Sequence, residues 1–125
     1  MNRGRRRGQR GSATLWAAVA VVVIAGVAAL LVLAGAARAV GERVRGAADL
    51  AALAGARAQG GNADACGAAR ESARLNRAEV VRCRVVGDEV EFVVTVEVRG
   101  AFRVAGAEHW FHADAHAGMV TGAPG

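Results

Sequence analysis

The sequence predicts an α+β protein in which a long N-terminal helix precedes a short second helix and a small antiparallel β-sheet. Three observations lead to this fold class. No charged residue occurs between Arg10 and Arg38, apolar residues recur at helical spacing after Arg38, and apolar and polar residues alternate between Val81 and Val98. The first two patterns are typical of α-helices and the third of β-strands.

We expect five segments along the 125 residues. After a helix of this length, the chain has room for one small domain only. The segments are a basic cytoplasmic leader (1–11), a transmembrane helix (12–37), an amphipathic extension of that helix (38–60), a small extracytoplasmic α+β domain (61–117) and a flexible tail (118–125).

The formal net charge of +5 lies entirely at the N-terminal end. From Arg38 onward, 11 arginines balance 11 acidic residues. A nucleic-acid-binding protein needs basic side chains spread over a folded face, so this distribution argues against nucleic acid as a partner. A basic cluster directly before an apolar run instead favours a cytoplasmic N-terminus. The cluster consists of Arg3, Arg5, Arg6, Arg7 and Arg10.

The charge-free run is long enough to cross a bilayer, since about 20 apolar residues suffice for a helix. Trp16 lies near its basic end, where an aromatic ring suits the membrane interface. One alternative is a cleaved secretory signal with its peptidase site among residues 34–39, but such signals have apolar regions of only about 7–15 residues. The other alternative, a buried soluble helix, needs a larger domain to cover it. We therefore expect a single-pass membrane anchor with the C-terminal domain outside the cytoplasm.

The helix is expected to continue past Arg38 with charged residues on one side and a narrow stripe of small residues on the other. Small residues let a second helix backbone approach closely, so the stripe predicts packing against another helix. Residues 59–62, Gln-Gly-Gly-Asn, should end the long helix. The stripe consists of Val40, Val44, Ala47, Ala51 and Ala54.

Asn62 or Asp64 is expected to cap a second helix that runs to about Leu75, with Asn76 as its stop. The period then changes to two. A strand with an apolar face of Val81, Cys83 and Val85, a two-residue turn at Gly87-Asp88 and a second strand from Val90 to Val98 predict a β-hairpin. Gly100 is expected to end this pattern, with a third strand at 101–104 and a fourth from Trp110 onward.

Cys66 and Cys83 are the only cysteines. The first is expected on an early turn of the second helix and the second on the apolar face of the first strand. A disulfide would stabilise a domain too small for a large core, and an extracytoplasmic position favours it. Two free buried thiols or half of a metal site are the alternatives.

All three histidines, His109, His112 and His116, lie in one short segment. His112, Asp114 and His116 would share one face of a strand, and imidazole with carboxylate can bind zinc. However, no second cluster completes a ligand set, and alternating polar residues are typical of the solvent face of a sheet. Metal-dependent activity is therefore only a third hypothesis. Because nucleophile motifs, phosphate loops and paired catalytic carboxylates are absent from the sequence, we expect no enzyme, no cofactor, no metal and no small-molecule substrate.

Three features in this order resemble the actinobacterial TadE/TadG-like proteins, which are minor pseudopilins of tight-adherence (Flp-type) pilus systems. They are the junction from Arg10 to Trp16, the alanine-rich segment 47–56, and the helix bearing Cys66 followed by the hairpin around Cys83. The resemblance implies a membrane-anchored pseudopilin or accessory component of a pilus or secretion machine. Its partners would be other pilin-like or Tad assembly proteins, contacted through the N-terminal helix.

The resemblance also implies cleavage by a prepilin peptidase between Gly11 and Ser12. Family members usually carry Glu at the fifth position after cleavage, where this chain has Trp16. An uncleaved accessory subunit is therefore an alternative to a polymerising one. A second hypothesis is a small extracytoplasmic binding protein, released by signal peptidase near residues 37–39.

Overall fold

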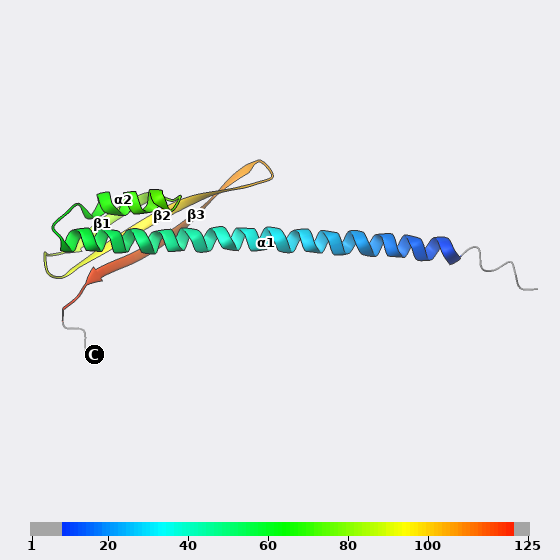
Figure 1. Ribbon diagram of the computed structural model, residues 1–125, viewed down its shortest axis with the longest axis horizontal. Helices are drawn as coiled ribbons and strands as arrows, with labels where there is room; N and C mark the ends of the chain where they lie inside the picture. The colour runs from blue at the N-terminus through cyan, green and yellow to red at the C-terminus, as the bar shows by residue number, and fades with distance from the viewer. Residues whose placement is uncertain (1–8, 122–125) are drawn as a thin grey trace, which may run out of the picture. The chain divides into compact units, whose positions relative to one another are not determined.

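The expected α+β arrangement is confirmed. The computed structural model describes residues 9–121, and the side chains of residues 11–121. Residues 1–8 of the predicted leader and 122–125 of the predicted tail lie outside the described residues. Two helices precede a three-stranded sheet (Figure 1): α1 (Gln9–Gly60), α2 (Ala65–Leu75), β1 (Glu79–Gly87), β2 (Phe92–Val104) and β3 (Ala107–Met119).

The chain divides into two compact units after Ala36. The first unit contains the apolar half of α1, and this half makes α1 long and apolar enough to cross a membrane. The side chains of residues 11–36 are all exposed. The second unit contains the remainder of α1, all of α2 and the sheet.

Both helices end at the residues that the sequence indicates as helix stops. α1 stops at Gly60, and Asn62 takes a left-handed backbone conformation with φ 56°. Asp64 caps α2, because its carboxylate accepts a hydrogen bond of 3.0 Å from the backbone N–H of Gly67. Asn76 forms the C-cap of α2, as expected.

The strands pair in the order β1-β2-β3, all antiparallel. The prediction of four strands is wrong, because β2 continues through Gly100 as far as Val104. Gly100 pairs with Phe111 of β3, and its lack of a side chain makes room for Val44 of α1. β3 also runs further than expected, to Met119, so paired structure extends two residues into the predicted tail.

The prediction of a two-residue turn at Gly87-Asp88 is also wrong. β1 and β2 are joined by the four residues 88–91, and the Asp88 carboxylate accepts hydrogen bonds from the backbone N–H groups of Glu91 (2.7 Å) and Val90 (2.8 Å). These two bonds hold the pKa of Asp88 below its usual value. The two-residue turn is instead at Ala105-Gly106, whose φ angles of 50° and 80° correspond to a type I′ hairpin turn.

The expected apolar face of β1 is correct for Cys83 and Val85 but not for Val81. Val80 pairs with Val98, and Arg82 pairs with Glu97, the residue directly before Val98 in β2. Val81 therefore has no partner and is an extra residue in the ladder. Such a β-bulge shifts the alternation by one position. Val80 therefore faces the core and Val81 is exposed.

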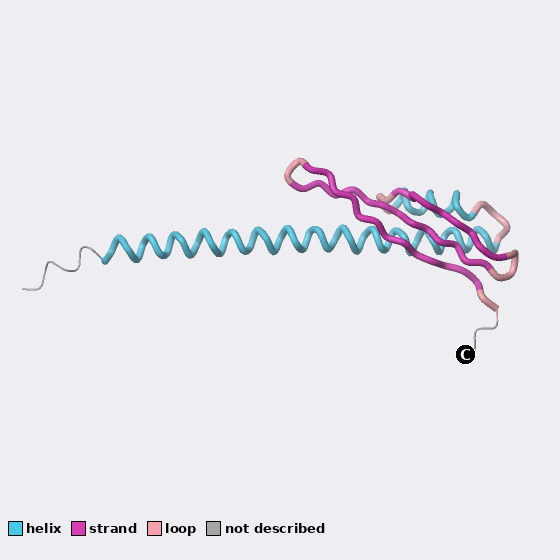
Figure 2. Tube along the Cα trace, turned by 180° about the vertical axis from the view of Figure 1, so that it is seen from behind, coloured by secondary structure: helices cyan, strands magenta, loops and turns pink. Residues whose placement is uncertain are grey.

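One face of the sheet is covered by α1 and α2 (Figure 2). The core between them is built from small residues, because alanines of both helices meet the valines of β2. Its buried residues are Val44, Ala48, Ala51, Ala52, Ala65, Ala69, Ala73, Phe92, Val94, Val96, Val98 and Ala115. The opposite face of the sheet, which we call the outer face, is largely polar.

Candidate functional site

The predicted small-residue stripe of α1 is covered by the protein's own domain. Val44, Ala47 and Ala51 are buried, and Val40 and Ala54 are half-buried. The alanines of α2 and the valines of β2 belong to the same buried cluster. Most of the stripe is thus buried within the protein's own domain, where Gly100 of β2 lies against Val44.

Gly55 shows how closely α1 approaches the other elements. A Cβ placed on Gly55 would lie 3.0 Å from Val94 Cγ1, 3.1 Å from the carbonyl oxygen of Ala65 and 3.6 Å from Ala69 Cβ. A Cβ there would press on Val94 and on the backbone of Ala65, so Gly55 lets α1, α2 and β2 come close together. Close packing of this kind explains why the segment 47–56 is rich in small residues, independently of any family resemblance.

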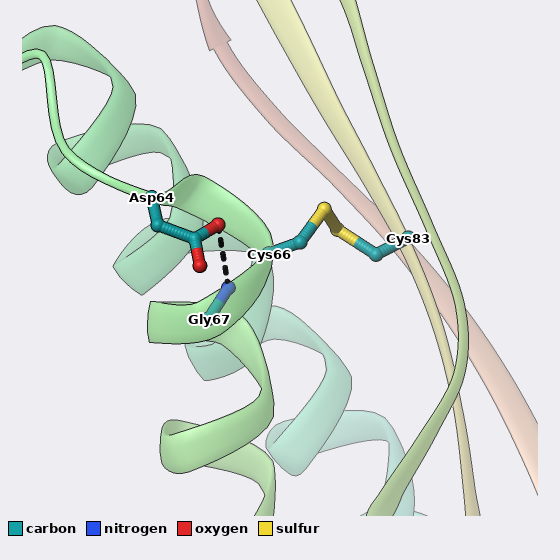
Figure 3. The surroundings of a disulfide bond; sticks show 4 residues. All are labelled: Asp64, Cys66, Gly67 and Cys83. Carbon is teal, nitrogen blue, oxygen red and sulfur yellow. Dashed lines mark hydrogen bonds between the residues drawn. A yellow bond between two sulfur atoms is a disulfide. The ribbon is translucent and has the colours of Figure 1, made fainter.

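Cys66 and Cys83 form a disulfide, with an S–S distance of 2.01 Å and a Cα–Cα distance of 5.8 Å. Figure 3 shows the bond directly after the Asp64 cap, joining the first turn of α2 to β1. It closes a loop of sequence separation 17, which corresponds to about 3 kcal/mol in the chain-entropy account. The expected disulfide is thus present, and within residues 11–121 no cysteine is free.

The predicted cleavage junction, Gly11-Ser12, lies in the first turn of α1. A Cβ on Gly11 would meet nothing within 4 Å, and the indole of Trp16 is 72 % exposed. The first turn of α1 contains no acidic residue. The junction is thus sterically open but helical, and Trp16 stands at the position where a carboxylate was expected.

The outer face of the sheet carries rows of polar residues that run across the three strands. In one row the Thr95 hydroxyl and His116 Nδ1 are 2.9 Å apart, and in the next Arg82 lies 3.6 Å from the Glu97 carboxylate. In a third row Arg99 donates two hydrogen bonds, of 3.0 and 2.9 Å, to one oxygen of Glu79. Two of these rows thus pair an arginine with a carboxylate of the neighbouring strand, whereas Glu97 and Asp114 are carboxylates that lie opposite each other in the ladder.

A shallow groove of about 470 Å³ lies on this outer face. Arg84 at its edge makes no hydrogen bond or ion pair with the residues that the structure describes. The alternation in β1 predicts that Arg82 and Arg84 share a face, but the groove itself could not be found from the sequence, because it depends on the register of three strands. Its polar lining consists of Arg82, Arg84, Thr95, Glu97, His112 and Asp114.

The three histidines are not brought together. His112 and His116 share the outer face with Asp114, as predicted, whereas His109 lies on the opposite side of β3. His116 uses Nδ1 for the Thr95 hydroxyl, and its Nε2 lies 3.5 Å from the Asp114 carboxylate. Among residues 11–121, no three His, Cys, Asp or Glu side chains are grouped to hold a metal ion.

Taken together, the geometry has two notable parts: an exposed apolar helix and a disulfide-stabilised domain with a polar outer face. Neither family models, nor curated proteins, nor solved structures match this chain.

Proposed function

We propose that this protein is a membrane-anchored, TadE-like minor pseudopilin or accessory component of a tight-adherence pilus or secretion machine. In this role it acts through helix packing and protein interaction and not through catalysis. The apolar half of α1 spans the membrane, the N-terminus is cytoplasmic, and the disulfide-linked domain is extracytoplasmic.

The observation that carries this proposal is the division of α1 into two chemically different halves. Residues 11–36 expose apolar side chains all round, whereas the following residues bury their small side chains in the domain core. Such exposure costs about 25 cal/mol per Å² of apolar surface in water, so this half needs lipid or other apolar helices around it. The disulfide favours an oxidising compartment for the domain.

The N-terminus of the native protein in its membrane fraction tests the anchor and its processing. An intact Met1 terminus supports an unprocessed accessory subunit, and a Ser12 terminus supports a processed pseudopilin. A mature protein that begins near residues 37–39 and is found in the culture fluid would overturn the anchored reading.

The assembly partner is tested by photo-crosslinking in living cells. A photoreactive residue at Val23, which is 58 % exposed in the apolar half of α1, should form adducts with Tad components. The same residue at Glu89, exposed in the β1–β2 loop, is the matched control for random collision. If neither Val23 nor other exposed positions of residues 11–36 yield an adduct with any Tad component, the pilus assignment fails.

One observation favours a second candidate, a small secreted binding protein. The compact unit that contains the domain begins at Ala37, within the segment where signal peptidase would cut. Cleavage there would leave the core intact, because its first buried residue is Val44. The groove on the outer face would then be the candidate binding surface.

A further inference from the structure

The hairpin of β2 and β3 extends beyond the rest of the sheet (Figure 2). The last pair between β1 and β2 is Glu79 with Arg99, so residues 100–111 form a two-stranded projection without a third strand. We call these residues the arm. Its tip, residues 104–107, is the uncharged sequence Val-Ala-Gly-Ala.

Two contacts fix the direction of the arm along α1. A Cβ on Gly60 would lie 3.9 Å from Phe92 Cζ, and a Cβ on Gly100 would lie 2.5 Å from Val44 Cγ2. β2 therefore runs antiparallel to α1. The lengths agree, since α1 covers about 24 Å from Gly60 to Val44 and β2 covers about 26 Å from Phe92 to Gly100. The arm continues from Gly100 towards the end of the domain where Arg38 lies.

The arm is long enough to reach that end. Arg38 precedes Val44 by about 9 Å of helix, whereas the strand from Gly100 to Val104 covers about 13 Å. Arg38 is the first charged residue after the apolar run. The tip of the arm therefore reaches the level at which, in the proposed anchor, the bilayer surface lies.

The distribution of aromatic residues points to the same surface. The chain has only two Trp, three Phe and no Tyr. Phe92 lies in the core, and Trp16 lies at the basic end of the apolar run. The remaining three are all in the arm, at positions 102, 110 and 111. Of these three, Phe111 packs against the core and Trp110 is exposed, and an exposed tryptophan suits the membrane interface.

Ring contacts hold the arm in shape. The rings of Phe102 and Phe111 are 6.0 Å apart, and the Arg99 guanidinium lies 4.6 Å from the centre of the Trp110 ring. Arg99 is itself bonded to Glu79. Trp110 nevertheless remains 44 % exposed. An indole with one exposed face and a neighbouring cation suits the headgroup region, which accepts apolar rings and polar groups together.

We propose that the arm rests on the outer surface of the membrane, with Trp110 among the lipid headgroups and residues 104–107 at the boundary with the acyl chains. This inference rests on the proposed membrane anchor. A single helix leaves the domain free to rotate about the helix axis, and a second contact with the bilayer prevents that rotation. The arm therefore sets the direction in which the polar outer face of the sheet is presented.

Brominated lipids, which quench tryptophan at short range, test the proposal on the full chain in nanodiscs. In Trp16→Phe, Trp110 is the only tryptophan, and lipids brominated near the headgroup end of their acyl chains should reduce its emission by about half, as expected for an interfacial ring. The matched control is the triple variant Trp16→Phe, Trp110→Phe, Val90→Trp. Val90 is 60 % exposed in the loop at the end of the sheet opposite the arm, and the emission of a tryptophan placed there should change little.

Trp110→Phe leaves Trp16 as the reporter of the anchor itself. Quenching of Trp16 and Trp110 without quenching of the tryptophan at position 90 supports the arm contact. Quenching of Trp16 alone overturns the arm contact and leaves the anchor standing. Equal quenching at positions 90 and 110 also overturns it, because the whole domain would then lie on the lipid. Loss of Trp16 quenching overturns the anchor, and the arm proposal with it.

Discussion

The contact between Gly100 of β2 and Val44 of α1 gives the sharpest prediction about folding. A Cβ at Gly100 would lie 2.5 Å from Val44 Cγ2, far inside van der Waals contact. Val44 is 1 % exposed, and its β-branched side chain has few alternative rotamers in a helix. We expect Gly100→Ala to destabilise the domain by about 1–3 kcal/mol through overpacking.

Val44→Ala removes the obstructing methyl group together with a second one. By itself it should cost about 2 kcal/mol, because two methyl groups at about 0.8 kcal/mol each leave the core and a cavity remains. In the double variant the methyl group introduced by Gly100→Ala occupies space that the Val44 side chain has vacated. The double variant should therefore lower the free energy of unfolding by about 2 kcal/mol. Independent effects of the two changes would add to about 4 kcal/mol.

The free energies of unfolding are measured by urea titration of the full chain in mild detergent. Trp110 emission in a Trp16→Phe background reports the unfolding. Gly46→Ala is the matched control, since a Cβ on Gly46 meets nothing within 4 Å. In the helix interior this change should stabilise by about 1 kcal/mol. Additivity of the Gly100 and Val44 variants within about 0.5 kcal/mol would refute the proposed packing of β2 on α1.

Three further predictions concern the disulfide and the two turns. Replacing Cys66 and Cys83 together with Ser should lower the free energy of unfolding by about 3 kcal/mol, and a native chain with equal mobility on reducing and non-reducing gels would contradict the bond. Ala105→Asn should stabilise by about 0.5–1 kcal/mol in the same titration, because Asn tolerates the positive φ of a type I′ turn; a loss of stability would argue against that turn. The lowered pKa of Asp88 means that its stabilising effect is complete above its ordinary pKa of 3.8 and is lost as the pH falls through the lowered value. The urea midpoints of the native chain and Asp88→Asn should therefore differ at pH 7 and converge in strong acid, and a constant difference would contradict the hydrogen bonds in the 88–91 loop.

The helices could be predicted from the sequence because their determinants are local. The Gly-Gly-Asn stop after Gln59 and the Asp64 cap each act within a few residues, and both helices stop where expected, although α1 begins at Gln9, inside the predicted leader. The disulfide was expected from the small size of the domain and its proposed extracytoplasmic position, with Cys66 on an early turn of the second helix and Cys83 on the apolar face of the first strand. These parts needed no knowledge of tertiary structure.

The sheet was predicted less well because register depends on contacts distant in sequence. Gly100 resembles a strand end, but it lies within β2 because Val44 of α1 fills the space of its missing side chain. Alternation also gave no sign of the bulge at Val81, which shifts the inward position to Val80. The groove on the outer face combines residues of all three strands, so it became visible only with the register.

The stripe on α1 shows a different limit. Small residues at helical spacing indicate that another backbone comes close, but they do not say whether it belongs to the same chain. Here Val44 and Ala51 of the stripe belong to the core cluster that the alanines of α2 and the valines of β2 also form. The surface left for other subunits in the proposed assembly is therefore the apolar half of α1 and the outside of the domain.

The membrane topology of the native chain tests the central claim most directly. Trypsin added to intact spheroplasts meets the arginines of the domain only if the domain lies outside the cytoplasm. We predict that an antibody against the domain loses its signal before lysis. In a chain that is not cleaved between Gly11 and Ser12, a peptide tag fused ahead of Met1 stays on a membrane-bound fragment until lysis. A domain protected until lysis, or a full-length chain found outside the membrane fraction, would contradict the proposed anchor and its orientation.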